Sequence, residues 1–390
     1  MGKFNLTSKS KIGIIGSGAM GSGIAQIAAT AGHSILIYDN NGSALTKASE
    51  NLKSGLQKLV EKQKITKEKS DAIIGNIQFV SDMETFASCD LIIEAIIEHL
   101  DIKKKVFTSL EDIVSKSCVL ATNTSSLSIT SIASSCKNPE RVIGIHFFNP
   151  ATLMPLVEII PGIATESSLP ELCKGLILEW KKVPVICKDT PGFIVNRIAR
   201  PYYGEAMRIA EEGIADMATI DWAMKSIGGF KMGPFELTDL IGHDVNYVVT
   251  ETVWKEFYFD QRFKPSLLQK RLVEAGFLGK KSGRGFYSYL EGTVQPSPNE
   301  NPEKGKLIFD RIIAMLINEA YDALNLKVAS AEDIDLAMTK GVNYPKGLIE
   351  WSHEIGIKNI LATLQDLYDT YQEDRYRPNV LLKKHATNQF

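Results

Sequence analysis

The 390-residue sequence has few cysteines, no long apolar run and almost no net charge. Its five cysteines are scattered and never spaced as CxxC, which argues against a disulfide framework or a zinc site and is typical of a reducing compartment. No apolar stretch approaches the roughly 20 residues that a membrane-spanning helix needs. The formal charge of −2 provides no overall basic surface for nucleic acid. We therefore expect no metal, no membrane partner and no nucleic-acid partner.

The amino terminus also lacks targeting signals. The segment MGKFNLTSKSK is polar, without the apolar core of a signal peptide or the arginine-rich pattern of a presequence. A myristoylation motif is incomplete, because position 6 is Leu6 rather than serine or threonine. We therefore expect a cytoplasmic protein, and its length indicates two or three domains.

A glycine-rich turn is the first strong motif in the chain, and it lies between the apolar run 11–15 and the helix-like segment 22–31. It has the pattern GxGxxG, and the cofactor-binding residues expected in it are Gly16, Gly18, Met20 and Gly21. Such glycines permit a tight bend, a close approach to a pyrophosphate and close helix packing. A second strand, 34–38, ends in Asp39, whose carboxylate can bind both ribose hydroxyls and repels a 2′-phosphate. The pattern favours NAD over NADP; a glycine turn in a generic α/β domain is the alternative.

Strands and helices continue to alternate up to position 186. The further expected strands are 77–80, 91–97, 119–122, 142–145, 156–160 and 183–186. This order is typical of a doubly wound Rossmann-type α/β sheet, which binds ligands beyond the carboxyl ends of its strands. Glu98, Lys103 and the polar cluster 123–126 follow such ends, so we expect them at the ligand-binding edge, although a helix N-cap is an alternative function of the cluster. Segment 42–74, which includes Lys62, is expected to be one long helix or a helical pair.

His146 directly follows the apolar run 142–145, and Glu158 lies within the run 156–160. Two prolines and an asparagine lie between the two runs. A turn in that segment would bring the two side chains together. A carboxylate that holds an imidazole fixes its tautomer and stabilises the imidazolium, which suits proton transfer near neutral pH. Taken alone, a histidine near a carboxylate at a strand end is more often a structural polar group than a catalytic one.

Beyond position 188 the pattern changes to helices alone. The segments 196–212, 217–226 and 234–256 are expected to be helical, and the basic turn 280–287 contains Lys281. The predicted domains are therefore 1–188 for NAD binding, 189–290 for a helical substrate or dimerisation domain, 291–305 for a linker and 306–390 for a second helical domain.

The second helical domain repeats the first with a constant offset of 114 positions. Identical pairs in this register include Arg197 and Arg311, Glu205 and Glu319, Asp221 and Asp335, Gly233 and Gly347, and Gly242 and Gly356. So many identities in one register indicate an internal duplication. Asn196 corresponds to Asp310, and the second copy ends before any equivalent of GKKSGRGF. If Asn196 takes part in chemistry, the second copy is structural.

Several motifs together resemble the L-3-hydroxyacyl-CoA dehydrogenase family, in its 3-hydroxybutyryl-CoA dehydrogenase branch and in an extended form. In chain order they are GSGAMGSGIA, EAIIEHLDIKKKVF, NTSSLSIT, HFFNP with MPLVEII, KDTPGFIVNR, and MGPFEL with GKKSGRGFY. The resemblance covers nearly the whole chain. It implies NAD as cofactor and the reversible oxidation of an (S)-3-hydroxyacyl-CoA to a 3-oxoacyl-CoA, a reaction of fatty acid metabolism and β-oxidation.

The resemblance also implies roles for single residues. His146 would be the catalytic base or acid and Glu158 its partner. Ser125 and Asn196 would contact the reacting oxygen of the substrate. The residues implied to lie against NAD are Asp39, Glu98, Lys103, Ser125, Asn149 and Lys281. Lys62 matches a CoA-contacting lysine of the family, whereas a CoA-contacting serine is replaced here by Gly55.

Substrate and assembly stay open within this resemblance. A short acyl chain such as 3-hydroxybutyryl-CoA is expected, but some extended members act on 3-hydroxyadipyl-CoA in aromatic catabolism. Shorter members dimerise through the helical domain, so the duplication implies either a homodimer or an intrachain pseudo-dimer. Two other classes compete: a β-hydroxyacid dehydrogenase, which uses a lysine near the position of Asn196, and a non-catalytic NAD-binding structural or sensor protein.

Overall fold

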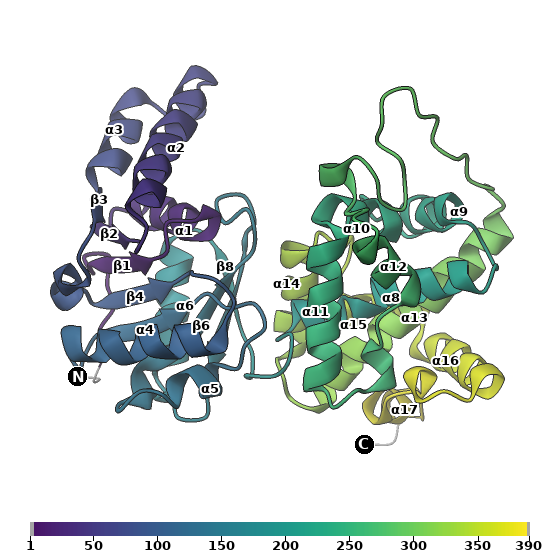
Figure 1. Cartoon of the computed structure of the whole chain (residues 1–390). Helices are drawn as coiled ribbons and strands as arrows, with labels where there is room; N and C mark the ends of the chain where they lie inside the picture. The colour runs from purple at the N-terminus through teal and green to yellow at the C-terminus, as the bar shows by residue number, and fades with distance from the viewer. Residues whose placement is uncertain (1–3, 388–390) are drawn as a thin grey trace. The chain divides into compact units, whose positions relative to one another are not determined.

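The computed structural model describes residues 4–387, so the first three residues of the segment screened for targeting signals lie outside it. The chain forms two compact units, Met1–Thr190 and Pro191–Phe390 (Figure 1). The first is an α/β unit and the second is helical. The first unit therefore contains the predicted NAD-binding domain, and the division of the second unit into two domains stays a prediction.

The first unit is built on one eight-stranded sheet with the order β3-β2-β1-β4-β5-β6-β7-β8. The strands are β1 (Ile12–Ile15), β2 (Ile35–Tyr38), β3 (Ile77–Val80), β4 (Leu91–Glu94), β5 (Val119–Thr122), β6 (Val142–Phe147), β7 (Leu156–Pro161) and β8 (Val183–Ile186). Every neighbouring pair is parallel except β6 and β7, which are antiparallel. The doubly wound sheet expected from the sequence is thus confirmed.

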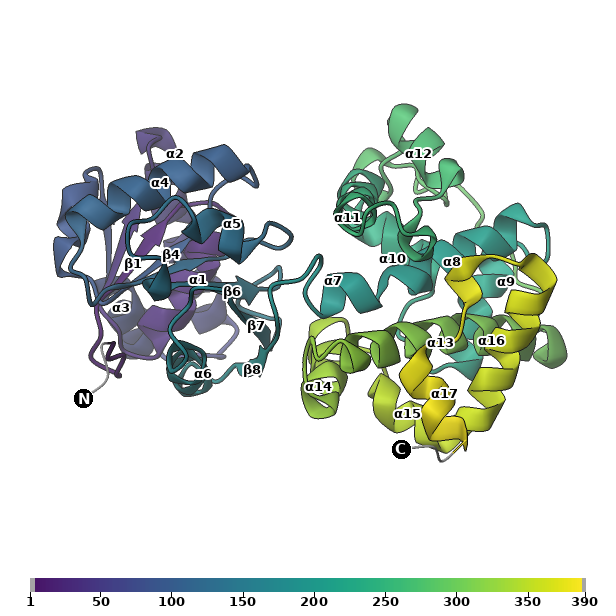
Figure 2. The same cartoon turned by 90° about the horizontal axis from the view of Figure 1, so that it is seen from below.

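Helices cover both faces of this sheet, as Figure 2 shows with α4 and α5 on one side and α1 and α6 on the other. Their bounds are α1 (Ala19–Thr30), α2 (Gly42–Glu61), α3 (Lys67–Gly75), α4 (Leu100–Ile113), α5 (Ile129–Ala133) and α6 (Leu169–Glu179), with short 3₁₀ turns at Met83–Ser88 and Pro139–Arg141. The central strands are buried on both faces, which is why they read as continuous runs of isoleucine, leucine and valine.

One expected strand is shorter in the structure, and of the two alternatives for segment 42–74 the helical pair is confirmed. The run 91–97 forms a strand only as far as Glu94, so Glu98 lies in the loop that precedes α4. Segment 42–74 is a helical pair rather than one helix, because Gln63 has a left-handed φ of 54° and Thr66 caps the second helix.

The second unit is arranged around α13 (Pro302–Asn325), most of which is buried and which packs against α8 and α16 (Figures 1 and 2). The helices before it are α7 (Val195–Ile198), α8 (Arg200–Glu211), α9 (Met217–Trp222), the π turn η3 (Ala223–Ile227), α10 (Pro234–Ile241), α11 (His243–Glu256) and α12 (Leu267–Glu274). Those after it are α14 (Ala331–Gly341), α15 (Leu348–Ile355), α16 (Ile357–Tyr371) and α17 (Val380–Thr387). Three 3₁₀ turns complete the unit at Gln261–Phe263, η5 (Lys280–Ser282) and Asp374–Tyr376.

Two boundaries in this unit were not expected. The predicted helix 234–256 is interrupted at Gly242, whose φ of 101° is outside the helical region. Helix α13 begins at Pro302, inside the range 291–305 that was expected to be a linker, because Asn301 caps it through a hydrogen bond from the backbone N of Lys304.

Two further properties bear on function. Across residues 4–387, no helix is long and apolar enough to cross a membrane. In the same part of the chain, no three histidine, cysteine or acidic side chains are grouped to hold a metal ion. The five cysteines are free thiols.

The packing of α1 on β1 yields a first prediction, concerning Gly21. A Cβ at Gly21 would lie 1.9 Å from the carbonyl oxygen of Gly16, so Gly21→Ala forces α1 away from the turn. We expect a loss of about 1–3 kcal/mol in the free energy of unfolding, as for other overpacked sites. Gly55→Ala is the matched control, since nothing lies within 4 Å of a Cβ on that exposed helix position. Its better helix propensity should add about 0.8–1.0 kcal/mol in urea unfolding. Equal effects of the two changes would contradict the prediction.

Candidate active site

The glycine turn leaves room for a ligand at the amino terminus of α1. Gly16 has a φ of 99°, and a Cβ there would lie 2.5 Å from the carbonyl oxygen of Ala95, so the tight turn requires glycine. At Gly18, by contrast, nothing lies within 4 Å of a Cβ. Open space above a helix amino terminus is what a pyrophosphate needs, because the N–H groups there point outward and the helix dipole favours an anion. The turn therefore fits the dinucleotide that the sequence predicts.

Asp39 lies at the end of β2, next to this turn. Its Oδ2 accepts hydrogen bonds from the backbone N of Ser17 at 2.8 Å and from Ser17 Oγ at 2.9 Å. Partial burial acts to raise the pKa of Asp39, but these bonds and one from Asn41 outweigh it and hold the pKa below its usual value. Asp39 is thus a fixed, ionised acceptor beside the turn, as the ribose-binding prediction requires.

Glu98 connects two of the predicted ligand-binding segments. Its Oε1 accepts hydrogen bonds from Thr124 Oγ1 at 2.6 Å and from the backbone N of Ser125 at 2.9 Å, and Ser125 Oγ is 3.3 Å away. Its Oε2 lies 3.3 Å from Lys103 Nζ. Residues 124–126 of the cluster therefore bind Glu98. The helix cap of α5 is Ser128, so the N-cap alternative is wrong for this cluster.

Lys103 has a second carboxylate partner that sequence reasoning missed. Glu94 is fully buried at the end of β4 and its Oε1 lies 2.6 Å from Lys103 Nζ, while its Oε2 accepts from Thr122 Oγ1 at 2.7 Å. A lysine that is 1% exposed needs such a partner, because an unpaired buried charge costs several kcal/mol. A glutamate inside an apolar run was the signal that could have revealed it.

His146 and Glu158 lie directly opposite each other in the antiparallel pair β6 and β7. His146 Nδ1 is 2.7 Å from Glu158 Oε2, and both side chains are buried. The expected contact between the two is confirmed. With Nδ1 held by the carboxylate, Nε2 is the second ring nitrogen through which this imidazole can exchange a proton.

Two more side chains hold the segment that carries this pair. Asn123 Oδ1 accepts from the backbone N of Phe147 at 2.8 Å, which ties the end of β5 to the end of β6. Lys182 Nζ donates to the carbonyl oxygens of Ala151 and Met154 at 2.6 and 2.8 Å. These bonds fix the loop after Asn149, and no sequence pattern indicated a role for Lys182.

The remaining predicted residues lie elsewhere. Met20 is in the first turn of α1, Asn149 is exposed in the loop between β6 and β7, and Lys62 is exposed at the carboxyl end of α2. Asn196 and Lys281 belong to the second unit, in α7 and η5. Lys281 Nζ lies 2.5 Å from Asp244 Oδ1.

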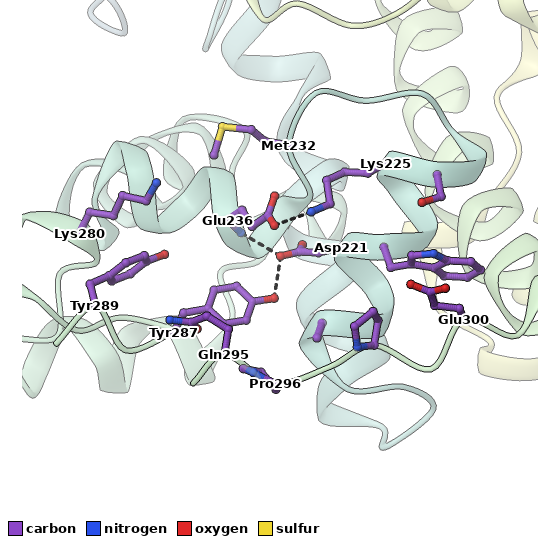
Figure 3. A pocket seen from close by; sticks show the side chains of 14 residues that line it. Asp221, Lys225, Met232, Glu236, Lys280, Tyr287, Tyr289, Gln295, Pro296 and Glu300 are labelled. Carbon is purple, nitrogen blue, oxygen red and sulfur yellow. Dashed lines mark hydrogen bonds and ion pairs between the residues drawn. The ribbon is translucent and has the colours of Figure 1, made fainter. Parts of the chain in front are cut away.

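A cavity of about 630 Å³ in the second unit is shown in Figure 3. Asp221 lies at its centre, but its carboxylate accepts from the backbone N of Phe235 and Glu236 at 2.9 and 3.0 Å and from Tyr287 OH at 2.7 Å. Asp221 therefore caps α10. None of the predicted site residues lines this cavity.

Removing a hydride from an alcohol carbon also releases a proton, so an enzyme for that reaction needs a dinucleotide site and a proton acceptor close together. The first unit has a glycine turn after β1 and the His146–Glu158 pair at the end of β6, and this arrangement fits the class of NAD-dependent oxidoreductases.

Comparison with known proteins specifies the class further. A sequence model described as "3-hydroxyacyl-CoA dehydrogenase, NAD binding domain" matches residues 11–190, and one described as "3-hydroxyacyl-CoA dehydrogenase, C-terminal domain" matches 192–289 and 307–390. The chain belongs to the 3-hydroxyacyl-CoA dehydrogenase family.

Relatives of different lengths match. The chain is 39% identical to 3-hydroxyadipyl-CoA dehydrogenase of Escherichia coli, over 96% of this chain and 97% of that one. It is 42% identical to 3-hydroxybutyryl-CoA dehydrogenase of Clostridioides difficile, which spans 72% of this chain and is covered over 99%. The crystal structure of 3-hydroxybutyryl-CoA dehydrogenase from Escherichia coli superposes with a TM-score of 0.92 at 38% identity, covering 98% of this chain and 99% of that one.

The contacts of Glu98 generate a prediction about acid stability. Burial acts to raise its pKa, but the charge of Lys103 and the hydrogen bonds from Thr124 and Ser125 lower it below its usual value. A carboxylate with a lowered folded-state pKa adds stability above its unfolded pKa of about 4.3, and this stability is lost as the pH falls through the folded pKa.

We therefore expect Glu98→Gln to be less heat-stable than the wild type at pH 6 and the difference in Tm to shrink by pH 3. Glu61→Gln, at an exposed position near the end of α2, is the control and should give a small difference at both values. A Glu98→Gln difference that stays constant over this range would contradict the assignment.

Proposed function

We propose that the protein catalyses the NAD-dependent, reversible oxidation of short-chain (S)-3-hydroxyacyl-CoA to 3-oxoacyl-CoA. The observation that carries the proposal is the His146–Glu158 contact of 2.7 Å at the sheet edge that also bears the glycine turn. The names of the full-length and shorter relatives support the substrate class.

In the oxidative direction, His146 Nε2 takes the proton of the 3-hydroxyl group. Glu158 stabilises the imidazolium that forms, because its carboxylate already holds Nδ1. General acid–base catalysis of this kind contributes roughly 10²–10⁴ to the rate. Ser125 and Asn196 donate hydrogen bonds to the reacting oxygen, and losing one such donor typically costs about 2.7–4 kcal/mol.

NAD, when bound, supplies the hydride acceptor at the nicotinamide. We assign its phosphates to the glycine turn and its ribose to Asp39. The other residues assigned to it are Glu98, Lys103, Ser125, Asn149 and Lys281. Lys62 is assigned to the CoA moiety. The hydrogen bond from the backbone N of Ser125 to Glu98 supports these assignments. It joins a residue assigned to NAD to one assigned to the reacting oxygen.

The acyl group is either 3-hydroxybutyryl or 3-hydroxyadipyl. We propose the short monocarboxylic chain as the main substrate, and relatives of matching length carry both names. Specific activities with C4, C6, C10 and 3-hydroxyadipyl-CoA substrates distinguish the two. Higher kcat/KM with the dicarboxylic chain would overturn the choice of acyl group without affecting the reaction class. We also propose that the enzyme works in the cytoplasm.

His146→Gln tests the reaction itself. We expect turnover with acetoacetyl-CoA, measured as the loss of NADH absorbance, to fall by at least about 10²-fold, because the proton donor is lost. NADH affinity in a fluorescence titration should stay within about twofold, and Glu158→Gln should lower kcat less than His146→Gln does. Near-normal reduction by His146→Gln would refute the mechanism. NADH binding without turnover of any acyl-CoA by the wild type would favour the sensor alternative.

We further propose that the second unit is an internal duplication that forms an intrachain pseudo-dimer. Two sets of equivalent contacts support this. Asp335 accepts from the backbone N of Ile349 and Glu350 at 2.8 and 3.0 Å, as Asp221 does 114 positions earlier for α10. The ion pair from Arg197 to Glu319, at 2.7 Å, has a counterpart from Arg311 to Glu205 at 2.6 Å. Reciprocal contacts of this kind are those of an isologous interface.

If a second copy already occupies the partner's surface, one chain is sufficient at that interface. We expect multi-angle light scattering of the whole protein at micromolar concentration to give the mass of a single 390-residue chain. A mass of two chains that persists on dilution to nanomolar concentration would favour the homodimer.

A further inference from the structure

The short helix α7 carries Asn196. The next residue, Arg197, forms ion pairs with residues that are far away in the sequence. Arg197 is fully buried, and its Nε lies 2.7 Å from Glu319 Oε1 on α13. Its Nη2 lies 2.6 Å from Asp322 Oδ2, one turn further along the same helix. Two carboxylates from the repeat half of the unit, residues 306–390, thus bind Arg197, the residue adjacent to Asn196.

These ion pairs belong to a larger network. Arg262 Nη1 lies 3.2 Å from Glu319 Oε2 and 2.8 Å from Asp322 Oδ2, so both carboxylates are shared between two arginines. The Arg197 guanidinium also lies 5.0 Å from the ring centre of Phe257. Charge-assisted bonds in a buried network are stronger than isolated surface pairs and fix geometry as well as energy.

Helix α7 needs such support, because it has only four residues. A helix of this length gains too few internal hydrogen bonds to offset the cost of its first turn. Its position is therefore set by tertiary contacts, among them the two ion pairs of Arg197 with α13.

We infer that Glu319 and Asp322 are positioning residues for Asn196, so that the repeat half of the unit contributes to catalysis without touching the substrate. The inference rests on the proposed role of Asn196 at the reacting oxygen. A donor that must meet a developing charge tolerates little displacement, and a misplacement of about 1 Å can cost about 10²-fold in rate.

The reciprocal pair provides a matched control within the same chain. Arg311 Nε lies 2.6 Å from Glu205 Oε1, with similar burial and the same chemistry, but the residue before Arg311 is Asp310 rather than asparagine. Breaking this pair disturbs the same interface but releases Arg311, which is not adjacent to an asparagine.

The test compares Glu319→Gln with Glu205→Gln, measuring Tm, kcat, KM for acetoacetyl-CoA and the Kd for NADH. We expect both to lower Tm, but only Glu319→Gln to lower kcat, by about 10- to 100-fold, with the Kd for NADH within twofold. Equal kcat values in the two variants would overturn the inference. Asp322→Asn is the milder second variant, because Asp322 is partly exposed, and it should reduce kcat in the same direction if Glu319→Gln does not fold.

Asn196→Ala separates this inference from the proposed function. If Asn196→Ala keeps the wild-type kcat, the role of Asn196 at the reacting oxygen is wrong. If it loses kcat, we expect Glu319→Gln to add no further loss in the Asn196→Ala background, because the two act through the same atom. Independent, multiplying losses would show that Glu319 does not act through Asn196.

Discussion

The antiparallel register between β6 and β7 determines where the pair proposed for proton transfer, His146 and Glu158, lies. His146 faces Glu158 only because the two strands pair with these residues opposite each other. Side chains alternate between the faces of a sheet, so a slip of one residue would move one of the two to the other face. The loop between the strands is held by Lys182, and Asn123 ties β6 to its parallel neighbour β5. The geometry of the His146–Glu158 pair is therefore a property of the sheet edge as a whole.

Local patterns were sufficient for the elements of the first unit. The glycine turn, Asp39 and the contact of His146 with Glu158 follow from apolar runs and the residues that end them, because strand ends in a parallel sheet share one edge. Sequence patterns did not predict the contacts of polar side chains that are buried in the core. Glu94 was read as part of an apolar strand, yet it neutralises Lys103 in the core. Such partners are set by packing between segments and leave no periodic signal.

The second unit shows the same limit at a larger scale. Helical periodicity predicted its helices, but the break at Gly242 depends on a backbone angle and the start of α13 on a cap at Asn301. The constant offset of 114 positions identified equivalent residues in the sequence, but it did not indicate which residues are in contact. Only the structure shows that Arg197 pairs with Glu319 and Arg311 with Glu205.

Those two ion pairs have a consequence for how this protein can change. In an assembly of two identical chains, one codon specifies both symmetric contacts, so a substitution alters them together. Here each contact is encoded separately, and either can be modified while the other is kept. The exchange of asparagine for aspartate between positions 196 and 310 is a difference of this kind. Under the proposed duplication, the half that carries Asn196 keeps the chemistry while the other half is free to specialise in support.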